Sequence, residues 1–161
     1  MRKAIDIARA HGRKVAFTLS DVFCISRHGG DFRKLIDDGL IDILFANENE
    51  LLALCEHEDF ESAIAHIHGK VPLLVVTRSE NGAMALQGDE RVEVPAEPIE
   101  RLVDTTGAGD MFAAGFLHGQ AQGRSLKESL TLGAVCAAEI IQHYGARPES
   151  DMKALAAQAL G

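Results

Sequence analysis

Short apolar runs alternate with helical segments along this chain, and this alternation restricts the possible folds more than any other feature. Runs typical of buried strands lie at residues 15–19, 41–46 and 71–77, and residues 83–86 and 91–94 form a hairpin pattern around a turn at 88–90. Helical periodicity occupies residues 2–11, 31–38, 48–55, 60–68, 111–121, 126–143 and 151–160. Because strands separated by helices favour right-handed crossovers, we predict an α/β three-layer sandwich with a mainly parallel sheet.

Two local expectations accompany this prediction. The first strand, at residues 15–19, is mostly apolar and is expected to be buried on both faces, as strands of parallel sheets are. Gly29 and Gly30 are expected to precede the helix at 31–38, which would leave Asp21 and Arg27 in the loop after the first strand.

Composition and charge exclude several classes of protein. The 161 residues suffice for one domain, and 16 Lys and Arg against 24 Asp and Glu give a net charge of −8. This balance argues against binding to nucleic acid, whose affinity comes mainly from Lys and Arg neutralising phosphates. No apolar run reaches the roughly 18–20 residues of a membrane span, and the amino terminus does not resemble a signal peptide. We therefore expect a cytoplasmic protein without a membrane segment.

Common metal and nucleotide motifs are absent from the sequence. The three cysteines never form a CxxC pair, and the seven histidines contain no HExxH, so thiols that are buried or have no particular role and surface histidines are expected rather than a zinc site. Neither a Walker A string nor a GxGxxG fingerprint occurs. A small anionic ligand remains compatible with the acidic charge, because helix amino termini bind phosphate through backbone amides.

Polar residues stand directly after the predicted strands. Asp21 follows the first strand, Asn47 follows the second, and Thr77 closes the third. A further polar segment, residues 104–110, opens the helix that follows the hairpin. Sheets of this class bind ligands beyond the carboxyl ends of their strands. The sequence therefore predicts one ligand site at this edge of the sheet.

The segment DTTGAGD at residues 104–110 has the composition of an anion-binding helix start. The apolar stripe that follows places the first turn at or near Gly107, and the small residues Gly107, Ala108 and Gly109 leave the first amides uncovered. Asp110 lies in this turn, where a carboxylate is favoured and could accept a proton from a hydroxyl group. Alternatively, the glycines only permit a tight turn and Asp110 is an ordinary first-turn charge.

The extended string DTTGAGDMFAAGF resembles the signature of the PfkB, or ribokinase-like, carbohydrate kinases. These enzymes use ATP to phosphorylate hydroxyl groups of sugars and nucleosides. The resemblance implies that Asp110 is the catalytic base and that the backbone of Gly107, Ala108 and Gly109 stabilises the transferring phosphoryl group. It also implies that Asp104 and Thr106 contribute to a monovalent-cation site, for K⁺, in members that use one, with Thr106 among the cofactor-binding residues.

The resemblance extends to four further segments. Asn47 and Glu50 match the Asn-x-x-Glu that helps to hold Mg²⁺, although this spacing is also that of a helix capping box, and both roles are compatible. Thr77 and Gly82 match a turn that binds nucleotide phosphates, with Ser79 in the usual place of its first glycine. Gly133 and Ala137 either leave room for adenine or serve helix packing, and Gly145, with Ala146 after it, resembles the second cation loop and the rim of the adenine pocket.

The resemblance covers nearly all of residues 1–161 but only the carboxyl-terminal half of the family's domain, without its first strands and its lid. From it we predict an ATP-dependent kinase that acts on a small hydroxylated substrate, a sugar or nucleoside, with Mg²⁺. The alternative is a non-catalytic nucleotide-binding or assembly module derived from such a kinase. Because a sheet without its neighbouring strands exposes an edge, we also expect a homo-oligomer or a partner subunit.

Overall fold

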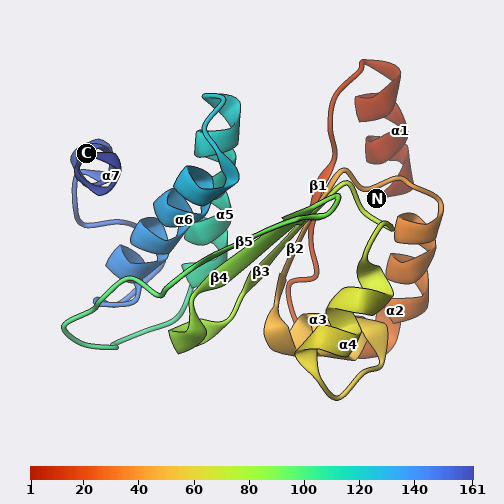
Figure 1. Ribbon diagram of the computed structural model, residues 1–161, viewed down its shortest axis with the longest axis horizontal. Helices are drawn as coiled ribbons and strands as arrows, with labels where there is room; N and C mark the ends of the chain where they lie inside the picture. The colour runs from red at the N-terminus through yellow and green to blue at the C-terminus, as the bar shows by residue number, and fades with distance from the viewer. The chain divides into compact units, whose positions relative to one another are not determined.

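The computed structural model describes residues 1–161 and divides into two compact units (Figure 1). The first unit contains residues 1–76 and 86–91, and the second contains residues 77–85 and 92–161. Five strands form a mixed, mostly parallel sheet whose spatial order equals the order along the chain. These strands are β1 (Ala16–Thr18), β2 (Ile43–Asn47), β3 (Leu73–Thr77), β4 (Ala83–Gln87) and β5 (Glu90–Val94). The predicted fold class and the hairpin are confirmed.

Four helices belong to the first unit: α1 (Arg2–Ala10), α2 (Val22–Asp37), α3 (Glu48–Cys55) and α4 (Phe60–Ile67). Strand β2 is buried at every residue but its last, and Leu44 is fully buried. Leu51 and Leu54 of α3 are equally inaccessible, so the apolar face of this helix forms part of the core. Burial of each such side chain stabilises the unit by roughly 1.5–3 kcal/mol.

Helix α2 corrects the sequence prediction, because it begins at Val22 rather than at residue 31. The Asp21 carboxylate accepts a hydrogen bond from the Phe23 amide at 2.7 Å and caps the helix. Asp21 is therefore the last residue of the connection after β1, as expected, whereas Arg27 lies inside the helix. Gly29 and Gly30 lie inside the helix. Two interior glycines cost about 1 kcal/mol each relative to alanine, and burial of the apolar face offsets this cost; that face consists of Ile25, Phe32, Leu35 and Ile36.

Strand β1 also differs from the prediction. It is shorter than expected, and Ala16 and Thr18 are exposed while Phe17 is half-buried. The strand lies parallel to β2, with Ala16 opposite Ile43, and it occupies one end of the sheet order. An apolar run alone does not distinguish a strand in the middle of a sheet from one at its edge, which explains the error.

The second unit contains the 3₁₀ turn η1 (Ser79–Asn81) and the helices α5 (Ala108–Ala121), α6 (Leu126–Ile140) and α7 (Met152–Leu160). Helices α5 and α6 pack closely through glycines. A Cβ atom on Gly115 would lie 2.5 Å from the Leu132 carbonyl oxygen, and one on Gly133 would lie 2.9 Å from the Phe112 carbonyl oxygen. Phe116 is fully buried. Ser125 and Glu128 form a capping box at the start of α6, as the spacing of a serine and a glutamate three residues later favours.

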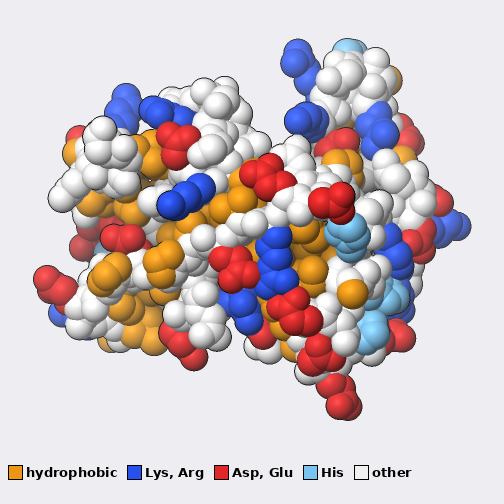
Figure 2. Space-filling view, in the orientation of Figure 1, with side chains coloured by type: hydrophobic (Ala, Val, Ile, Leu, Met, Phe, Trp, Pro, Cys, Tyr) orange, Lys and Arg blue, Asp and Glu red, His pale blue; other side chains and the backbone are white.

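Helix α6 ends at Ile140 rather than continuing to residue 143. The next residues contact the stretch before α5 instead, because the Val103 amide donates to the Ile141 carbonyl at 2.8 Å. No helix in the chain is both long enough and apolar enough to cross a bilayer. On the face drawn in Figure 2, acidic and basic side chains are interspersed rather than gathered in one large basic area.

Candidate active site

The start of helix α5 has backbone amides without a partner, although the Ala108 amide donates to the Thr105 carbonyl oxygen at 3.1 Å. Gly107 is the residue before the helix, and its φ of +81° lies in the left-handed region that favours glycine. No side chain caps this start, and the amides of Gly109 and Asp110 have no acceptor within the protein. Such amides at the positive end of a helix dipole favour an anion. The predicted helix start is confirmed.

The residues at this start are accessible to a ligand. Gly109 and Asp110 are exposed, and Gly107 and Ala108 are half-buried. A Cβ atom built on Gly109 would meet no atom within 4 Å, so the space beside it is open. The residues that we predict to stabilise the phosphoryl group and to activate the attacking hydroxyl therefore lie together in one accessible turn.

Asp104 joins the loop before α5 to the loop after α6. Its Oδ1 accepts the Thr106 amide at 2.9 Å, and its Oδ2 accepts the Gly145 amide at 3.1 Å. Hydrogen bonds from the Thr106 hydroxyl and amide, and from the Gly145 amide, hold the pKa of this carboxyl below its usual value. Three predicted site residues, Asp104, Thr106 and Gly145, are thus brought together around one ionised carboxylate.

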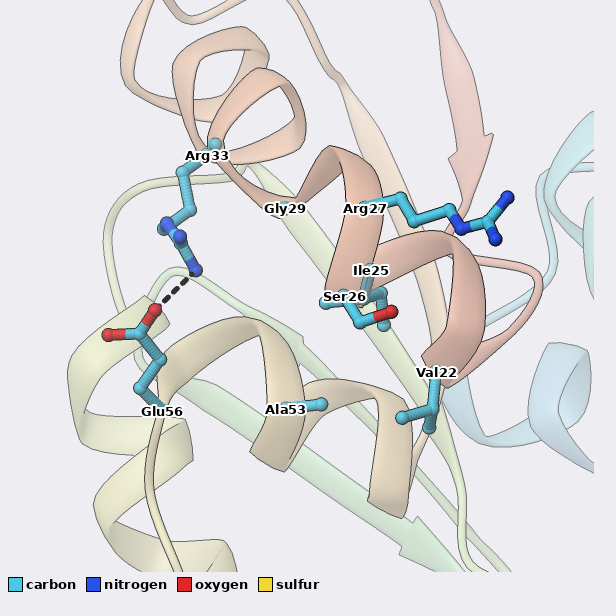
Figure 3. A pocket seen from close by; sticks show the side chains of 9 residues that line it. Val22, Ile25, Ser26, Arg27, Gly29, Arg33, Ala53 and Glu56 are labelled. Carbon is cyan, nitrogen blue, oxygen red and sulfur yellow. Dashed lines mark ion pairs between the residues drawn. The ribbon is translucent and has the colours of Figure 1, made fainter.

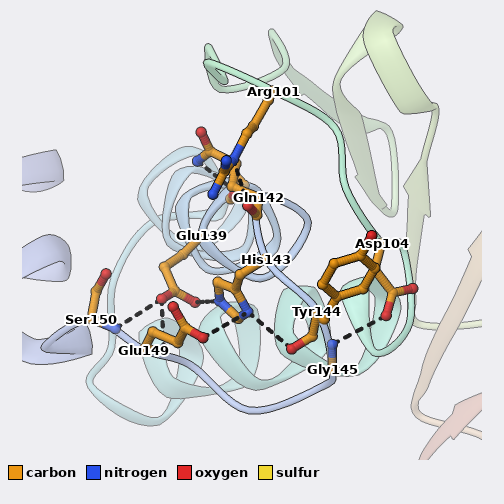
Figure 4. A network of polar contacts seen from close by, with 10 residues as sticks. Arg101, Asp104, Glu139, Gln142, His143, Tyr144, Gly145, Glu149 and Ser150 are labelled. Atoms are coloured by element: carbon orange, nitrogen blue, oxygen red, sulfur yellow. Dashed lines mark hydrogen bonds and ion pairs between the residues drawn. The ribbon is translucent and has the colours of Figure 1, made fainter.

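The loop after α6 also packs directly against the start of α5 (Figure 4). A Cβ atom on Gly107 would lie 2.6 Å from the Ala146 Cβ, so glycine is required here both by its conformation and by the space available. The Gln142 side chain accepts the Glu100 amide at 2.9 Å, which fixes the stretch before Asp104 to the same loop. No local pattern indicates these contacts, because they join residues some 40 positions apart; only the family resemblance assigned both loops to a cation site.

Glu139 and His143 form a second polar cluster in this region, which sequence reasoning missed. Burial raises the pKa of Glu139, but hydrogen bonds from the Ser150 and Glu149 amides and from His143 outweigh it, so the pKa is lowered overall. For His143 burial lowers the pKa, and the contacts with Glu139, the Tyr144 carbonyl and Glu149 raise it overall. The sequence signal for this cluster was a glutamate, Glu139, in the last turn of a mostly apolar helix, where a buried carboxylate needs polar partners.

The other predicted nucleotide-binding residues lie elsewhere in the second unit. Thr77 ends β3, and Gly82 has a φ of +83° with no room for a side chain, since a Cβ would lie 2.0 Å from the Val94 carbonyl oxygen. Ser79 has a left-handed φ of +48°, a conformation that glycine would favour at this position. Gly133 is buried beneath Phe112 and Ala137 is half-buried, so helix packing accounts for Gly133, and its role toward adenine stays a prediction.

Asn47 and Glu50 belong to the first unit and form a complete capping box at the start of α3. Asn47 Oδ1 accepts the Glu50 amide at 2.8 Å, and Glu50 Oε2 accepts the Asn47 amide at 2.9 Å. Glu50 is buried, and this burial, with a smaller contribution from Asp21, raises its pKa although the hydrogen bond from the Asn47 backbone opposes it. A carboxylate and an amide oxygen are donors that Mg²⁺ prefers. Their role as metal ligands stays a prediction.

A cavity of the first unit lies between α2 and α3 (Figure 3). It is an open hollow of about 280 Å³ that includes Val22, Ile25 and Ala53 in its lining. Arg33 spans one side, where its guanidinium pairs with the Glu56 carboxylate at 3.1 Å. None of the predicted site residues lines this cavity.

Comparisons with known proteins identify the family. The sequence profile of the pfkB family carbohydrate kinases matches residues 1–153, so the chain belongs to this family. The chain is 43% identical over 108 residues to a cytidine kinase of Thermococcus kodakarensis, covering 65% of this chain and 38% of that protein. It is 36% identical over 115 residues to a ribokinase of Arabidopsis thaliana, covering 67% of this chain and 30% of that protein.

Solved structures share the fold. The adenosine kinase of Sinorhizobium meliloti matches with a TM-score of 0.94 and 47% identity, over 98% of this chain and 48% of that one. A putative ribokinase II of Escherichia coli, in complex with ATP and Mg²⁺, matches with a TM-score of 0.85 and 25% identity, over 99% of this chain and 52% of that one. The predicted ribokinase-like fold is confirmed, and the chain spans about half the length of these structures.

Proposed function

We propose that this chain is the nucleotide-binding and catalytic-base part of an ATP-dependent kinase that phosphorylates a hydroxyl group of a sugar or nucleoside. The observation that carries the proposal is the exposed, uncapped start of α5 with Asp110 in its first turn. Membership of the pfkB family supports it, as do the names of the relatives, which include cytidine kinase, ribokinase and adenosine kinase.

In this proposal the start of α5 supplies two functions. The amides of Gly107, Ala108 and Gly109 stabilise the negative charge that spreads over the phosphoryl oxygens during transfer. The Asp110 carboxylate orients the attacking hydroxyl and accepts its proton. Both functions require groups fixed before the reaction, and a helix start held by a left-handed glycine provides them.

Two cations belong to the proposed reaction. Mg²⁺, held with its waters by Asn47 and Glu50, would neutralise charge on the nucleotide phosphates. A monovalent cation, K⁺, would bind at Asp104. The ionised Asp104 carboxylate accepts amides from the loop before α5 and from the loop after α6. The nucleotide itself would contact Thr77, Gly82, Thr106, Gly133, Ala137 and Gly145.

Replacement of Asp110 tests the proposed function. We expect Asp110→Asn to lower the rate of phosphoryl transfer by about 10²–10⁴-fold, because the hydroxyl loses its base, while the affinity for ATP changes little. Transfer from ATP to a panel of sugars and nucleosides is measured with Mg²⁺, and ATP affinity by calorimetry. Asp151→Asn is the matched control, because Asp151 is also an aspartate at a helix start of the second unit.

The outcomes separate the proposal from its alternative. Because the chain spans about half the length of its relatives, little transfer by the chain alone is compatible with both. With the family's first strands and lid also present, binding of ATP without transfer of phosphate to any acceptor would favour a non-catalytic nucleotide-binding or assembly module. A wild-type chain that produces no heat with ATP and Mg²⁺ would reject both.

A further inference from the structure

We propose that Glu139 is a positioning residue that fixes residues 143–150 against the start of α5 and thereby sets the affinity of the site for nucleotide phosphate; this inference rests on the proposed function. Glu139 lies in the last turn of α6, and its side chain is only 7% exposed. It does not touch the predicted phosphate-binding residues, so its action must pass through the loop.

The Glu139 carboxylate has three hydrogen-bond partners, all from the segment that follows α6 (Figure 4). Oε1 accepts the amides of Glu149 and Ser150, both at 2.8 Å. Oε2 lies 3.3 Å from Nε2 of His143, which donates to it. One carboxylate therefore anchors both ends of residues 143–150.

Two residues in the middle of the anchored segment, Gly145 and Ala146, contact residues of the candidate site. The Gly145 amide donates to Asp104 Oδ2 at 3.1 Å, and Asp104 Oδ1 in turn accepts the Thr106 amide. Ala146 packs against Gly107 so closely that Gly107 has no room for a side chain. Two separate contacts thus connect the segment held by Glu139 to the turn that begins α5.

Burial of the Glu139 carboxylate at the end of α6 is energetically unfavourable unless these hydrogen bonds form. A carboxylate in the last turn of a helix faces the negative end of the helix dipole, and burial of an unpaired charge is strongly unfavourable. The two backbone amides and the imidazole offset both costs. Without them the carboxylate would favour solvent, so the buried Glu139 and the ordered loop require each other.

The experiment compares three variants of the full chain with the wild type. Glu139→Ala removes every acceptor, whereas Glu139→Gln keeps one side-chain oxygen that can accept the two amides. Glu128→Gln is the matched control, because Glu128 is a carboxylate that hydrogen-bonds Ser125 at the other end of the same helix. Affinity for ATP with Mg²⁺ is measured by calorimetry, and the amide resonances of Gly107 and Gly109 by NMR without nucleotide.

We expect Glu139→Ala to weaken ATP binding by about tenfold or more, because small displacements of positioning groups are expensive. The Gly107 and Gly109 resonances should shift in the same variant. Glu139→Gln should recover most of the affinity, and Glu128→Gln should leave both readouts close to the wild type. A general loss of stability would not produce recovery by glutamine.

Equal ATP affinity and unchanged glycine resonances in Glu139→Ala would overturn the inference and leave the proposed function intact. If Glu139→Ala does not fold, the Glu139→Gln variant is compared with the wild type alone. A loss of ATP affinity together with shifted Gly107 and Gly109 resonances supports the positioning role. A loss of ATP affinity without such shifts overturns the positioning role. A wild-type chain that binds no ATP would reject the proposed function, and unmoved glycine resonances would then also reject the positioning role.

Discussion

Two glycines of the same motif differ in what the fold requires of them. Gly107 has a φ of +81°, and Ala146 occupies the space where its side chain would be, whereas Gly109 lies inside the first turn of α5 with open space beside it. The DTTGAGD string does not reveal this difference. At the residue scale, Gly107 serves the structure of the loop, and Gly109 is the candidate for direct approach by a ligand.

Alanine substitutions at these two positions should therefore behave differently. Gly107→Ala should lower the free energy of unfolding by about 2 kcal/mol or more, because a left-handed alanine is strained and its methyl group displaces Ala146. Gly109→Ala should change it by less than about 1 kcal/mol yet weaken ATP binding, because only the ligand side of the turn is affected. Urea denaturation and calorimetry check both. Equal losses of stability would contradict this assignment.

The hairpin of α5 and α6 depends on close contact between the two helix backbones. A Cβ atom on Gly115 would lie 2.5 Å from the Leu132 carbonyl oxygen and 2.8 Å from the Cys136 Sγ. In α2, by contrast, Gly30 is exposed and a Cβ there would meet no atom within 4 Å. At the scale of the element, glycine is required in one helix and only tolerated in the other.

The two helices should therefore respond to alanine with opposite signs. Gly115→Ala should destabilise the protein by about 1–3 kcal/mol, because the rigid backbone of α6 must move. Gly30→Ala should stabilise it by roughly 0.5–1 kcal/mol, because alanine loses less backbone entropy in a helix than glycine does. The midpoints of urea denaturation give both values. Stabilisation by Gly115→Ala would show that α5 and α6 pack less closely than described.

Within residues 1–161, β1 lies at an edge of the sheet. Val15 accepts the Ile43 amide and Leu19 donates to the Phe45 carbonyl, both on the β2 side. Because backbone groups alternate in direction along a strand of a parallel pair, Ala16 and Thr18 direct theirs to the opposite side. Their side chains are exposed as well. Unpaired backbone groups at such an edge can pair with a strand of another chain. The homo-oligomer therefore stays a prediction.

Proline at this edge tests the expected association. We expect sedimentation velocity to give species heavier than the 17.3 kDa monomer, in proportions that depend on concentration. Ala16→Pro should shift them toward the monomer without changing the circular dichroism, because it removes an outward amide that serves no bond within the sheet. Ala16→Thr keeps the amide and is the control. A wild-type monomer at every concentration would contradict the prediction.

Local patterns determined most of the elements and the two capping boxes. The helix at Glu48–Cys55 and the capping boxes at Asn47 and Ser125 follow from side chains that contact backbone three residues away, so neighbouring residues suffice to predict them. The start of α5 at Gly107 follows from the same kind of local information. The resemblance carried by DTTGAGD predicted the family, which the match over residues 1–153 shows.

Tertiary structure decided the features that depend on distant residues. The continuation of α2 through Gly29 and Gly30 depends on burial of its apolar face, and the exposure of β1 depends on its position in the sheet. The link from Asp104 to Gly145 and the partners of Glu139 depend on where α6 ends. Sequence periodicity reports only which faces are apolar, whereas these contacts arise from the packing of those faces, and packing joins residues that no local pattern connects.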